Sequence, residues 1–256
     1  MLMKFLRHAN NLLYRLCGLR LTHYHPDEPP AFIDGAFWKI YEKHRDKTSV
    51  FWSDAHTAYA VAKYVAVNGV EGDIVECGVW RGGCSIIMAE TLKYYGCLNK
   101  KVFMYDTYAG MSEPSERDFP IGSTESPHPH WKELNKDTHN AWFYAPIEEV
   151  KRNANAADYP SDNFVFVKGK VEDTLPGVIP CAISVLRLDT DWYRSTYHEM
   201  EHLFPRLSIG GVLIVDDYAA YAGAKNAVDD YLKEQKIRIF LAADPLTGKV
   251  AGIKQH

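Results

Sequence analysis

Residues 73–83 have the sequence DIVECGVWRGG, and this stretch decides the fold class. A short apolar run ends in a glycine-rich turn, and a helical pattern over residues 85–95 follows it. Further apolar runs occur at residues 101–105, 164–168, 183–188 and 212–215, with helical patterns near 147–156, 195–207 and 222–234. Apolar strands that alternate with helices form parallel sheets covered on both faces. We therefore predict an α/β fold with a doubly wound, mostly parallel sheet.

The remaining segments add to this core. Residues 238–242 and 249–254 flank a turn-forming stretch and predict a hairpin that contributes an antiparallel strand. Residues 1–70 predict an N-terminal helical extension, and residues 71–256 predict the main domain. Within that domain, residues 107–146 are rich in Pro, Ser, Glu and His and have no strand pattern. An irregular insert of this length predicts a lid or binding loop.

Besides a short amphipathic helix expected within residues 22–48, the N-terminal extension contains two helical patterns. Residues 1–21 carry several leucines among four basic residues and no acidic residue, which predicts a basic amphipathic helix. Such a helix either docks on a second subunit of a homo-oligomer, which we favour, or makes peripheral contact with an anionic inner-membrane surface. A second helix is predicted to begin with Ser53 or Asp54 as its cap and to end at Asn68-Gly69.

Composition excludes several classes of protein. The chain has 256 residues, 46% of them hydrophobic, which excludes global disorder. With 29 basic and 33 acidic residues its net charge is −4, which argues against nucleic acid as the main partner. The five cysteines are odd in number and form no C-x-x-C pair, so neither a disulfide framework nor a zinc ribbon is expected and a reducing cytoplasm is predicted. No run approaches the ~18 apolar residues of a membrane-spanning helix.

The glycine-rich turn favours a particular cofactor. Its pattern, E-x-G-x-x-x-G-G from Glu76 to Gly83, differs from the dinucleotide pattern G-x-G-x-x-G. A carboxylate directly before Gly78 repels a pyrophosphate and suits a ligand with an ammonium group, such as S-adenosylmethionine (SAM). We expect SAM to lie over this turn, which includes Arg81 and Gly82. The alternative is a tight strand-to-helix turn without a ligand.

Acidic residues follow three of the predicted strands. Asp106 ends the second strand, where a carboxylate can accept both ribose hydroxyls of an adenosine or simply cap a helix. Four further carboxylates follow the fourth and fifth strands, in RLDTDWY and VDDY: Asp189, Asp191, Asp216 and Asp217. Ends of parallel strands meet at one edge, where these charges repel one another unless a hard divalent cation joins them. That prediction requires that no lysine or arginine fills the gap; the alternative is a set of solvated helix caps.

Histidines of the insert are candidates for a general base. His128, His130 and His139 all lie within residues 107–146, and an imidazole titrates near neutral pH. For each of them a surface position is the more frequent role.

With these motifs in place, the sequence resembles the macrocin O-methyltransferase-like family, which includes macrolide and aminocoumarin sugar methyltransferases. The matching stretches cover residues 72–83, 106–118, 147–153, 167–175, 187–196 and 210–231. The resemblance implies a Rossmann-like class I methyltransferase fold and an O-methyltransferase that depends on SAM and Mg²⁺. It implies a small-molecule or glycan substrate, with methylation of a sugar hydroxyl of a glycan, nucleotide sugar or glycosylated natural product.

The resemblance also implies roles for individual residues. Near the cofactor it places Thr48, with Glu76 and Gly78 at the methionine end, Asp106 at the ribose, and Gly169 and Lys170 at the adenine. Lys170 departs from the family, whose other members carry an apolar or aromatic residue there. The implied Mg²⁺ ligands are Asp189, Asp216 and Asp217. The base is either Asp191 or a lid histidine, for which we consider His139.

Other functions remain open at this point. A catechol-type O-methyltransferase would methylate a phenolic vicinal diol instead of a sugar. A non-catalytic SAM-binding protein would keep the fold without the reaction. An NAD(P)-dependent oxidoreductase is disfavoured by the glycine spacing of residues 76–83.

Overall fold

The structure is a computed structural model that describes residues 33–244 and 247–255. The predicted basic helix of residues 1–21 lies outside the described residues. Contacts divide the chain into two compact units, Met1–Trp38 and Lys39–His256, and the fold and site below belong to the second unit. Among the helices of the described residues, none is both long and apolar enough to cross a lipid bilayer.

A seven-stranded sheet forms the centre of the second unit, in the order β3-β2-β1-β4-β5-β7-β6. Its strands are β1 (Asp73–Cys77), β2 (Val102–Asp106), β3 (Phe164–Lys168), β4 (Ile183–Leu188), β5 (Leu207–Val215), β6 (Ala242–Ala243) and β7 (Val250–Ile253). The first five are parallel, whereas β7 pairs antiparallel with β5 and β6 with β7. The predicted α/β fold with a C-terminal antiparallel hairpin is therefore confirmed. Strand β5 begins five residues earlier than its apolar run because it opens with the polar and glycine-rich stretch LSIGG.

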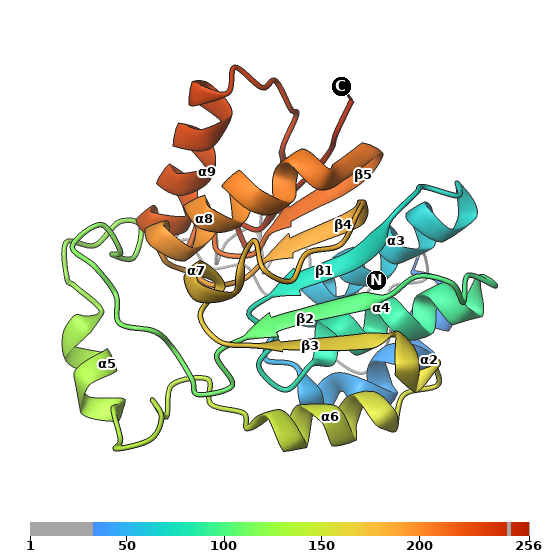
Figure 1. The fold of residues 1–256 in the computed structure, drawn as a ribbon, viewed down its shortest axis with the longest axis horizontal. Coiled ribbons are helices and arrows are strands. Elements are labelled where there is room, and N and C mark those ends of the chain that lie inside the picture. The colour runs from blue at the N-terminus through green and yellow to red at the C-terminus, as the bar shows by residue number, and fades with distance from the viewer. Residues whose placement is uncertain (1–32, 245–246, 256) are drawn as a thin grey trace, which may run out of the picture. The chain divides into compact units, whose positions relative to one another are not determined.

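Helices cover both faces of the sheet (Figure 1). They are α2 (Gly35–His44), α3 (Trp52–Val67), α4 (Gly83–Tyr94), α5 (His128–Leu134), α6 (Ile147–Asn155), α7 (Val171–Thr174), α8 (Tyr193–Leu203) and α9 (Ala222–Glu234), with short 3-10 turns at Arg45–Lys47, Ser161–Asn163 and Phe204–Arg206. Neighbouring strand residues point to opposite faces, so Ile74 packs with α3, α4 and α6 while Val75 packs with α7, α8 and α9. Each face thus has its own apolar core.

The predicted cap of α3 is wrong. The helix begins after Phe51 and no side chain caps it, so both Ser53 and Asp54 lie within its first turn. Asp54 is instead buried, accepts a hydrogen bond from Thr247 Oγ1 at 2.8 Å and pairs with Lys249 Nζ at 3.2 Å. The Asp54 carboxylate therefore forms a tertiary ion pair with Lys249 in place of the predicted helix cap. The predicted end of the helix at Asn68 is confirmed.

The insert of residues 107–146 lies beyond the arrowheads of the parallel strands (Figure 1). It is largely irregular but tied to its surroundings by side-chain hydrogen bonds. Trp131 Nε1 donates to Met111 O at 2.9 Å within the insert, and Trp192 Nε1 donates to Ser112 O at 2.9 Å from the loop after β4. Backbone bonds between residues 119–121 and 220–222 attach it to the start of α9. These contacts place the insert over the carboxyl edge of the sheet.

Glu90 on α4 is a charged group that the fold buries away from this edge. Its Oε1 atom accepts hydrogen bonds from Lys43 Nζ at 2.7 Å, from His44 Nε2 at 2.8 Å and from the Asp158 N–H at 2.8 Å. Burial opposes ionisation, but these three bonds outweigh it and lower the pKa of Glu90 to about 2. The ionised carboxylate therefore ties α2 and the loop after α6 to α4.

We expect Glu90→Gln to lower the free energy of unfolding by about 2 kcal/mol at pH 7. A lowered folded-state pKa contributes stability above the unfolded-state value, and this stability is lost as pH falls from about 4.5 toward 2. Between pH 5.5 and 3.5 the wild type should therefore lose about 1 kcal/mol more than the variant in urea unfolding. Glu148→Gln, at an exposed pair, is the control and should change stability by less than about 0.5 kcal/mol. Equal pH profiles for wild type and Glu90→Gln would contradict the assignment.

Candidate active site

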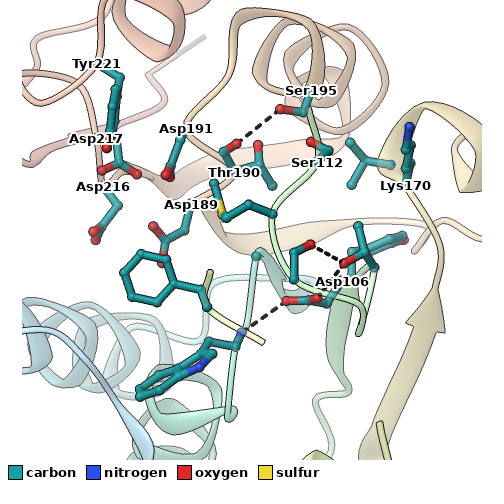
Figure 2. A pocket seen from close by; sticks show the side chains of 18 of the residues that line it. Asp106, Ser112, Lys170, Asp189, Thr190, Asp191, Ser195, Asp216, Asp217 and Tyr221 are labelled. Carbon is teal, nitrogen blue, oxygen red and sulfur yellow. Dashed lines mark hydrogen bonds between the residues drawn. The ribbon is translucent and has the colours of Figure 1, made fainter. Parts of the chain in front are cut away.

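A cavity of about 270 Å³ opens at the carboxyl edge of the sheet (Figure 2). Ligands of open parallel sheets bind at this edge. The walls come from the loops that follow all five parallel strands and from the insert. The lining residues are Ser49, Val50, Gly78, Trp80, Tyr105, Asp106, Thr107, Gly110, Met111, Ser112, Phe143, Gly169, Lys170, Val171, Glu172, Asp189, Thr190, Asp191, Ser195, Asp216, Asp217 and Tyr221.

All four predicted acidic residues of the fourth and fifth strands line this cavity. Carboxylate oxygens of Asp189, Asp191 and Asp217 lie within 4.8 Å of one another, and Asp191 and Asp217 point toward each other (Figure 2). Burial together with the neighbouring negative charges raises the pKa of Asp189 and of Asp217, and raises that of Asp191 to about 7. Asp217 Oδ2 is buried without a hydrogen-bond partner in the described structure. An unpaired buried carboxylate oxygen beside two other carboxylates offers oxygen donors of the kind that a divalent cation binds.

Arg187, at the end of β4, is buried beneath these acids. Its Nη1 atom lies 2.5 Å from Glu76 Oε1 and 2.6 Å from Asp189 Oδ2, and its Nη2 atom lies 2.5 Å from Asp216 Oδ1. Burial alone would lower the pKa of the guanidinium, but the charges of Asp189 and Asp216 raise it well above its usual range. One permanent positive charge thus joins the ends of β1, β4 and β5.

The prediction that no basic side chain enters the acidic rim, formed by Asp189, Asp191, Asp216 and Asp217, is wrong, because Arg187 contacts Asp189 as well as Asp216. The Asp216 Oδ1 atom is also 2.6 Å from Lys249 Nζ, so two cations share one carboxylate oxygen. Burial raises the pKa of Asp216, but the positive charges of Arg187 and Lys249 lower it by more, so the net shift is downward. The carboxylates that gather with one another are therefore Asp189, Asp191 and Asp217, whereas the predicted ligand set named Asp216 in place of Asp191. Pairing of β1 with β4 sets Arg187 opposite Glu76, a register that only the sheet defines.

In the glycine-rich turn, two glycines let the backbone pass close to other segments of the chain. A Cβ atom on Gly78, whose φ is +81°, would lie 1.9 Å from the Asp189 carbonyl oxygen. A Cβ on Gly83 would lie 2.5 Å from the Lys47 carbonyl oxygen. These glycines are therefore required by neighbouring segments of the chain itself. Of the residues in this turn, Gly78 and Trp80 line the cavity, whereas Gly82 does not.

Asp106 holds this turn in place. Its Oδ2 atom accepts the N–H groups of Val79 at 2.8 Å and Trp80 at 3.0 Å, and its Oδ1 atom accepts the N–H of Tyr108 at 2.7 Å. Burial raises the pKa of Asp106 although these three bonds favour its ionised form. The carboxylate thus ties the turn after β1 to the start of the insert while it lines the cavity.

The predicted cofactor residues divide into two groups. Gly78, Asp106, Gly169 and Lys170 line the cavity, and Thr48, Glu76, Arg81 and Gly82 do not. Glu76 is buried behind Arg187 and accepts a hydrogen bond from Ser85. Arg81 pairs with Glu149 at 2.5 Å and donates to the Asp46 carbonyl at 2.8 Å. Thr48 contacts Cys84 Sγ at 3.8 Å, while the next two residues reach the cavity.

The lid histidines lie away from the cavity wall. His139 stacks on Tyr144 with ring centroids 4.0 Å apart, and His130 contacts Trp142 at 4.8 Å. His128 Nε2 is 2.9 Å from Glu113 Oε1. Asp191 is the predicted base that lines the cavity.

Aromatic residues of the wall were missed by the sequence prediction. Trp80 and Phe143 both line the cavity, with ring centroids 6.0 Å apart in an edge-on contact. Both have positive φ, 45° and 48°, a backbone conformation that bulky side chains rarely adopt and that is found at ligand clamps. Tyr221 lines the cavity next to Asp217 (Figure 2). Trp80 lies inside the glycine-rich motif, and this position could have indicated that it lines the site. No sequence pattern marked Phe143 or Tyr221 as wall residues.

Comparisons with known proteins match this chain to a methyltransferase family. Residues 56–245 match the family described as macrocin-O-methyltransferase (TylF). The 8-demethyl-8-(2,3-dimethoxy-alpha-L-rhamnosyl)-tetracenomycin-C 4'-O-methyltransferase of Streptomyces olivaceus is 35% identical over 86% of this chain and 80% of its own length. The demethyldecarbamoylnovobiocin O-methyltransferase of Streptomyces niveus is 34% identical over 64% of this chain and 59% of its own length.

Solved methyltransferase structures have a similar fold. The O-methyltransferase NovP superposes with a TM-score of 0.71 and 29% identity, covering 82% of this chain and 83% of that protein. The calicheamicin methyltransferase CalS11 has a TM-score of 0.58 at 17% identity, with 91% and 94% covered, and supports the fold alone.

Arg187→Lys tests whether the guanidinium organises the rim. A single ammonium group cannot reach Glu76, Asp189 and Asp216 together, so we expect a loss of about 2 to 4 kcal/mol in the free energy of unfolding, measured in urea. Arg194→Lys makes the same exchange at a side chain that is 84% exposed and should change stability by less than about 0.5 kcal/mol. Equal stability of the two variants would show that the contacts of Arg187 do not hold the strand ends.

Proposed function

This chain belongs to the macrocin-O-methyltransferase (TylF) family, and on that premise we propose that it transfers the methyl group of SAM to a sugar hydroxyl with the help of Mg²⁺. The observation that carries the proposal is one cavity in which the carboxylates Asp189, Asp191 and Asp217 converge beside the glycine-rich turn. A rhamnosyl group in the name of the Streptomyces olivaceus relative favours a deoxysugar-bearing acceptor.

The proposed cofactor region is the part of the cavity between the turn after β1 and the loop after β3. When bound, SAM supplies an electrophilic methyl carbon. Asp106 orients the turn through its three backbone hydrogen bonds, and its position on the wall suits the ribose. Gly169 and Lys170 line the wall at the loop after β3 and are assigned to the adenine. Glu76 acts through Arg187, since its carboxylate is buried behind that guanidinium.

The proposed metal region is the acidic rim. Asp189 and Asp217 would hold the ion, because their carboxylates converge and Asp217 Oδ2 has no partner in the described structure. Asp216, the third predicted ligand, lines the same cavity but is held by Arg187 and Lys249 through its Oδ1 atom, outside the group of converging carboxylates. A divalent cation there supplies the positive charge that makes a weakly acidic sugar hydroxyl easier to deprotonate.

Asp191 is the proposed general base. Its carboxylate is 7% exposed, lines the cavity and faces Asp217, so it is placed to accept a proton from an acceptor hydroxyl at the rim. Its φ of 66° is uncommon for a non-glycine residue and carries local strain of the kind found at functional sites. The aromatic walls at Trp80, Phe143 and Tyr221 provide apolar faces against which a sugar ring can stack.

An acceptor panel tests the proposed function. With SAM and Mg²⁺ present, we expect methyl transfer to rhamnosyl glycosides or nucleotide-linked deoxysugars, and at least ~100-fold lower kcat/KM for catechol. A thermal-shift assay should show stabilisation by SAM and S-adenosylhomocysteine and none by NAD. Faster methylation of catechol than of every sugar would favour the catechol-type alternative. SAM binding without transfer to any acceptor would favour a non-catalytic protein.

Metal removal should stop the proposed reaction without displacing the cofactor. We expect excess EDTA to reduce turnover by more than ~100-fold, because the charge that acidifies the hydroxyl is removed, and Mg²⁺ to restore it. Asp217→Asn should show the same loss at saturating Mg²⁺, with SAM affinity in calorimetry changed by less than about threefold. Asp173→Asn, in the turn of α7 outside the cavity wall, is the matched control. Undiminished turnover in EDTA would exclude a metal role.

Asp191→Asn and His139→Asn distinguish the two predicted bases. If Asp191 accepts the proton, its variant should lose at least ~100-fold in kcat at saturating Mg²⁺ while the Mg²⁺ concentration for half-activation stays unchanged. His139→Asn should retain kcat within about threefold, because His139 lies off the cavity wall. A raised Mg²⁺ requirement for Asp191→Asn would assign Asp191 to the metal instead, and a large loss in His139→Asn would assign the base to the lid.

A further inference from the structure

A second cluster of metal-binding side chains lies on α8, outside the cavity. His198, Glu201 and His202 offer ligand atoms within 4.8 Å of one another. Glu201 and His202 follow His198 by three and four positions on one helix, so each of them is a neighbour of His198 on the helix surface. The two imidazole rings meet edge-on with centroids 4.3 Å apart. Side chains of His202 and Glu201 are 26% and 56% exposed, so an ion can enter from solvent.

Residues 198–202 have the sequence HEMEH, which fits the zinc-binding helix pattern H-E-x-x-H. In hydrolases with this pattern the first glutamate activates water on the metal. Here that residue, Glu199, is fully buried, and its Oε1 atom accepts a hydrogen bond from Thr190 Oγ1 at 3.0 Å. Glu199 therefore faces the core and cannot serve a solvent-side metal. Glu201 is the acidic residue that shares the face of the histidines.

The orientation of His198 is set by a backbone carbonyl. Its Nε2 atom lies 3.4 Å from Leu175 O, so this nitrogen faces the backbone carbonyl and Nδ1 is the nitrogen left for an ion. Metal-binding histidines are oriented by this kind of hydrogen bond from the nitrogen that does not bind the ion. His202 Nε2 is 3.8 Å from Glu201 Oε2, so both remaining ligands already adjoin each other.

We propose that His198, Glu201 and His202 bind a zinc-type transition-metal ion in a site separate from the acidic rim. Imidazole nitrogens with one carboxylate favour Zn²⁺ and its neighbours, whereas the all-carboxylate rim favours a hard ion such as Mg²⁺. Three protein ligands leave one position of a tetrahedron for water or a further ligand. The site stabilises α8, the helix that begins two residues after Asp191. It does not depend on the proposed reaction.

Calorimetry with the full chain tests the site. After metal removal and in excess Mg²⁺, added to compete with Zn²⁺ for the carboxylates of the rim, we expect one equivalent of Zn²⁺ to bind and the melting temperature to rise. Co²⁺ should give visible absorption bands typical of nitrogen ligands in a four-coordinate site. His198→Ala and His202→Ala should each weaken Zn²⁺ binding by at least ~100-fold, and Glu201→Gln by about tenfold. Circular dichroism verifies that these partly exposed substitutions leave the fold intact.

Two controls make the result specific. His128→Ala removes a histidine with a similar glutamate contact, at 2.9 Å, but with no second histidine assigned to it, and should leave Zn²⁺ affinity unchanged. Asp217→Asn alters the rim and should also leave it unchanged. Zinc affinity that survives both His198→Ala and His202→Ala, or that is lost in Asp217→Asn, overturns the proposal. These readouts are independent of methyl transfer, so either proposal can fail without the other.

Discussion

The buried guanidinium of Arg187 is the interaction on which the candidate site depends. It contacts carboxylates from the ends of β1, β4 and β5, and a buried ion can persist only if its charge and its hydrogen bonds are satisfied. Backbone bonds from Asp189 to Cys77 and from Asp216 to Leu188, both 2.9 Å, align the same strand ends. The rim is therefore held in register by its own charges, with acids that face the cavity supported by a cation beneath them.

The part of the cavity assigned to the cofactor depends on the close packing of the turn after β1 against the loop after β4. Gly78 lets the turn after β1 pass against the Asp189 carbonyl, and Asp106 then fastens this turn through two N–H groups. The region assigned to the cofactor and the rim assigned to the metal thus share a wall, because the turn after β1 packs directly on the loop after β4. In a methyltransferase this proximity brings donor and acceptor together, which accounts for a large part of the rate of a bimolecular reaction.

Helix α8 adjoins both of the proposed cation sites. It begins just after the carboxylates of the rim and carries the two imidazoles and the carboxylate of the proposed zinc site on its outer face. Oxygen ligands and nitrogen ligands select different ions, so both sites can be filled in one molecule. Buried Glu199 separates them, with its carboxyl bonded to Thr190 in the loop of the rim. Burial raises the pKa of Glu199 to about 8, so its neutral form is stabilised between the two sites.

The order of apolar runs and the glycine-rich turn were enough to predict the parallel sheet, its closing hairpin and the edge at which Asp106, Asp189, Asp191, Asp216 and Asp217 meet. These features follow from local periodicity and from the rule that parallel strands end at one edge. The partners of each charge were decided only by the tertiary structure. Arg187 reaches Glu76 through strand register, Lys249 reaches Asp54 and Asp216 from the final hairpin, and Asp54 thereby leaves the helix end it was predicted to cap. A charged side chain pairs with an opposite charge that lies within a few ångströms of it. The number of residues between the two in the sequence does not reveal this distance in space.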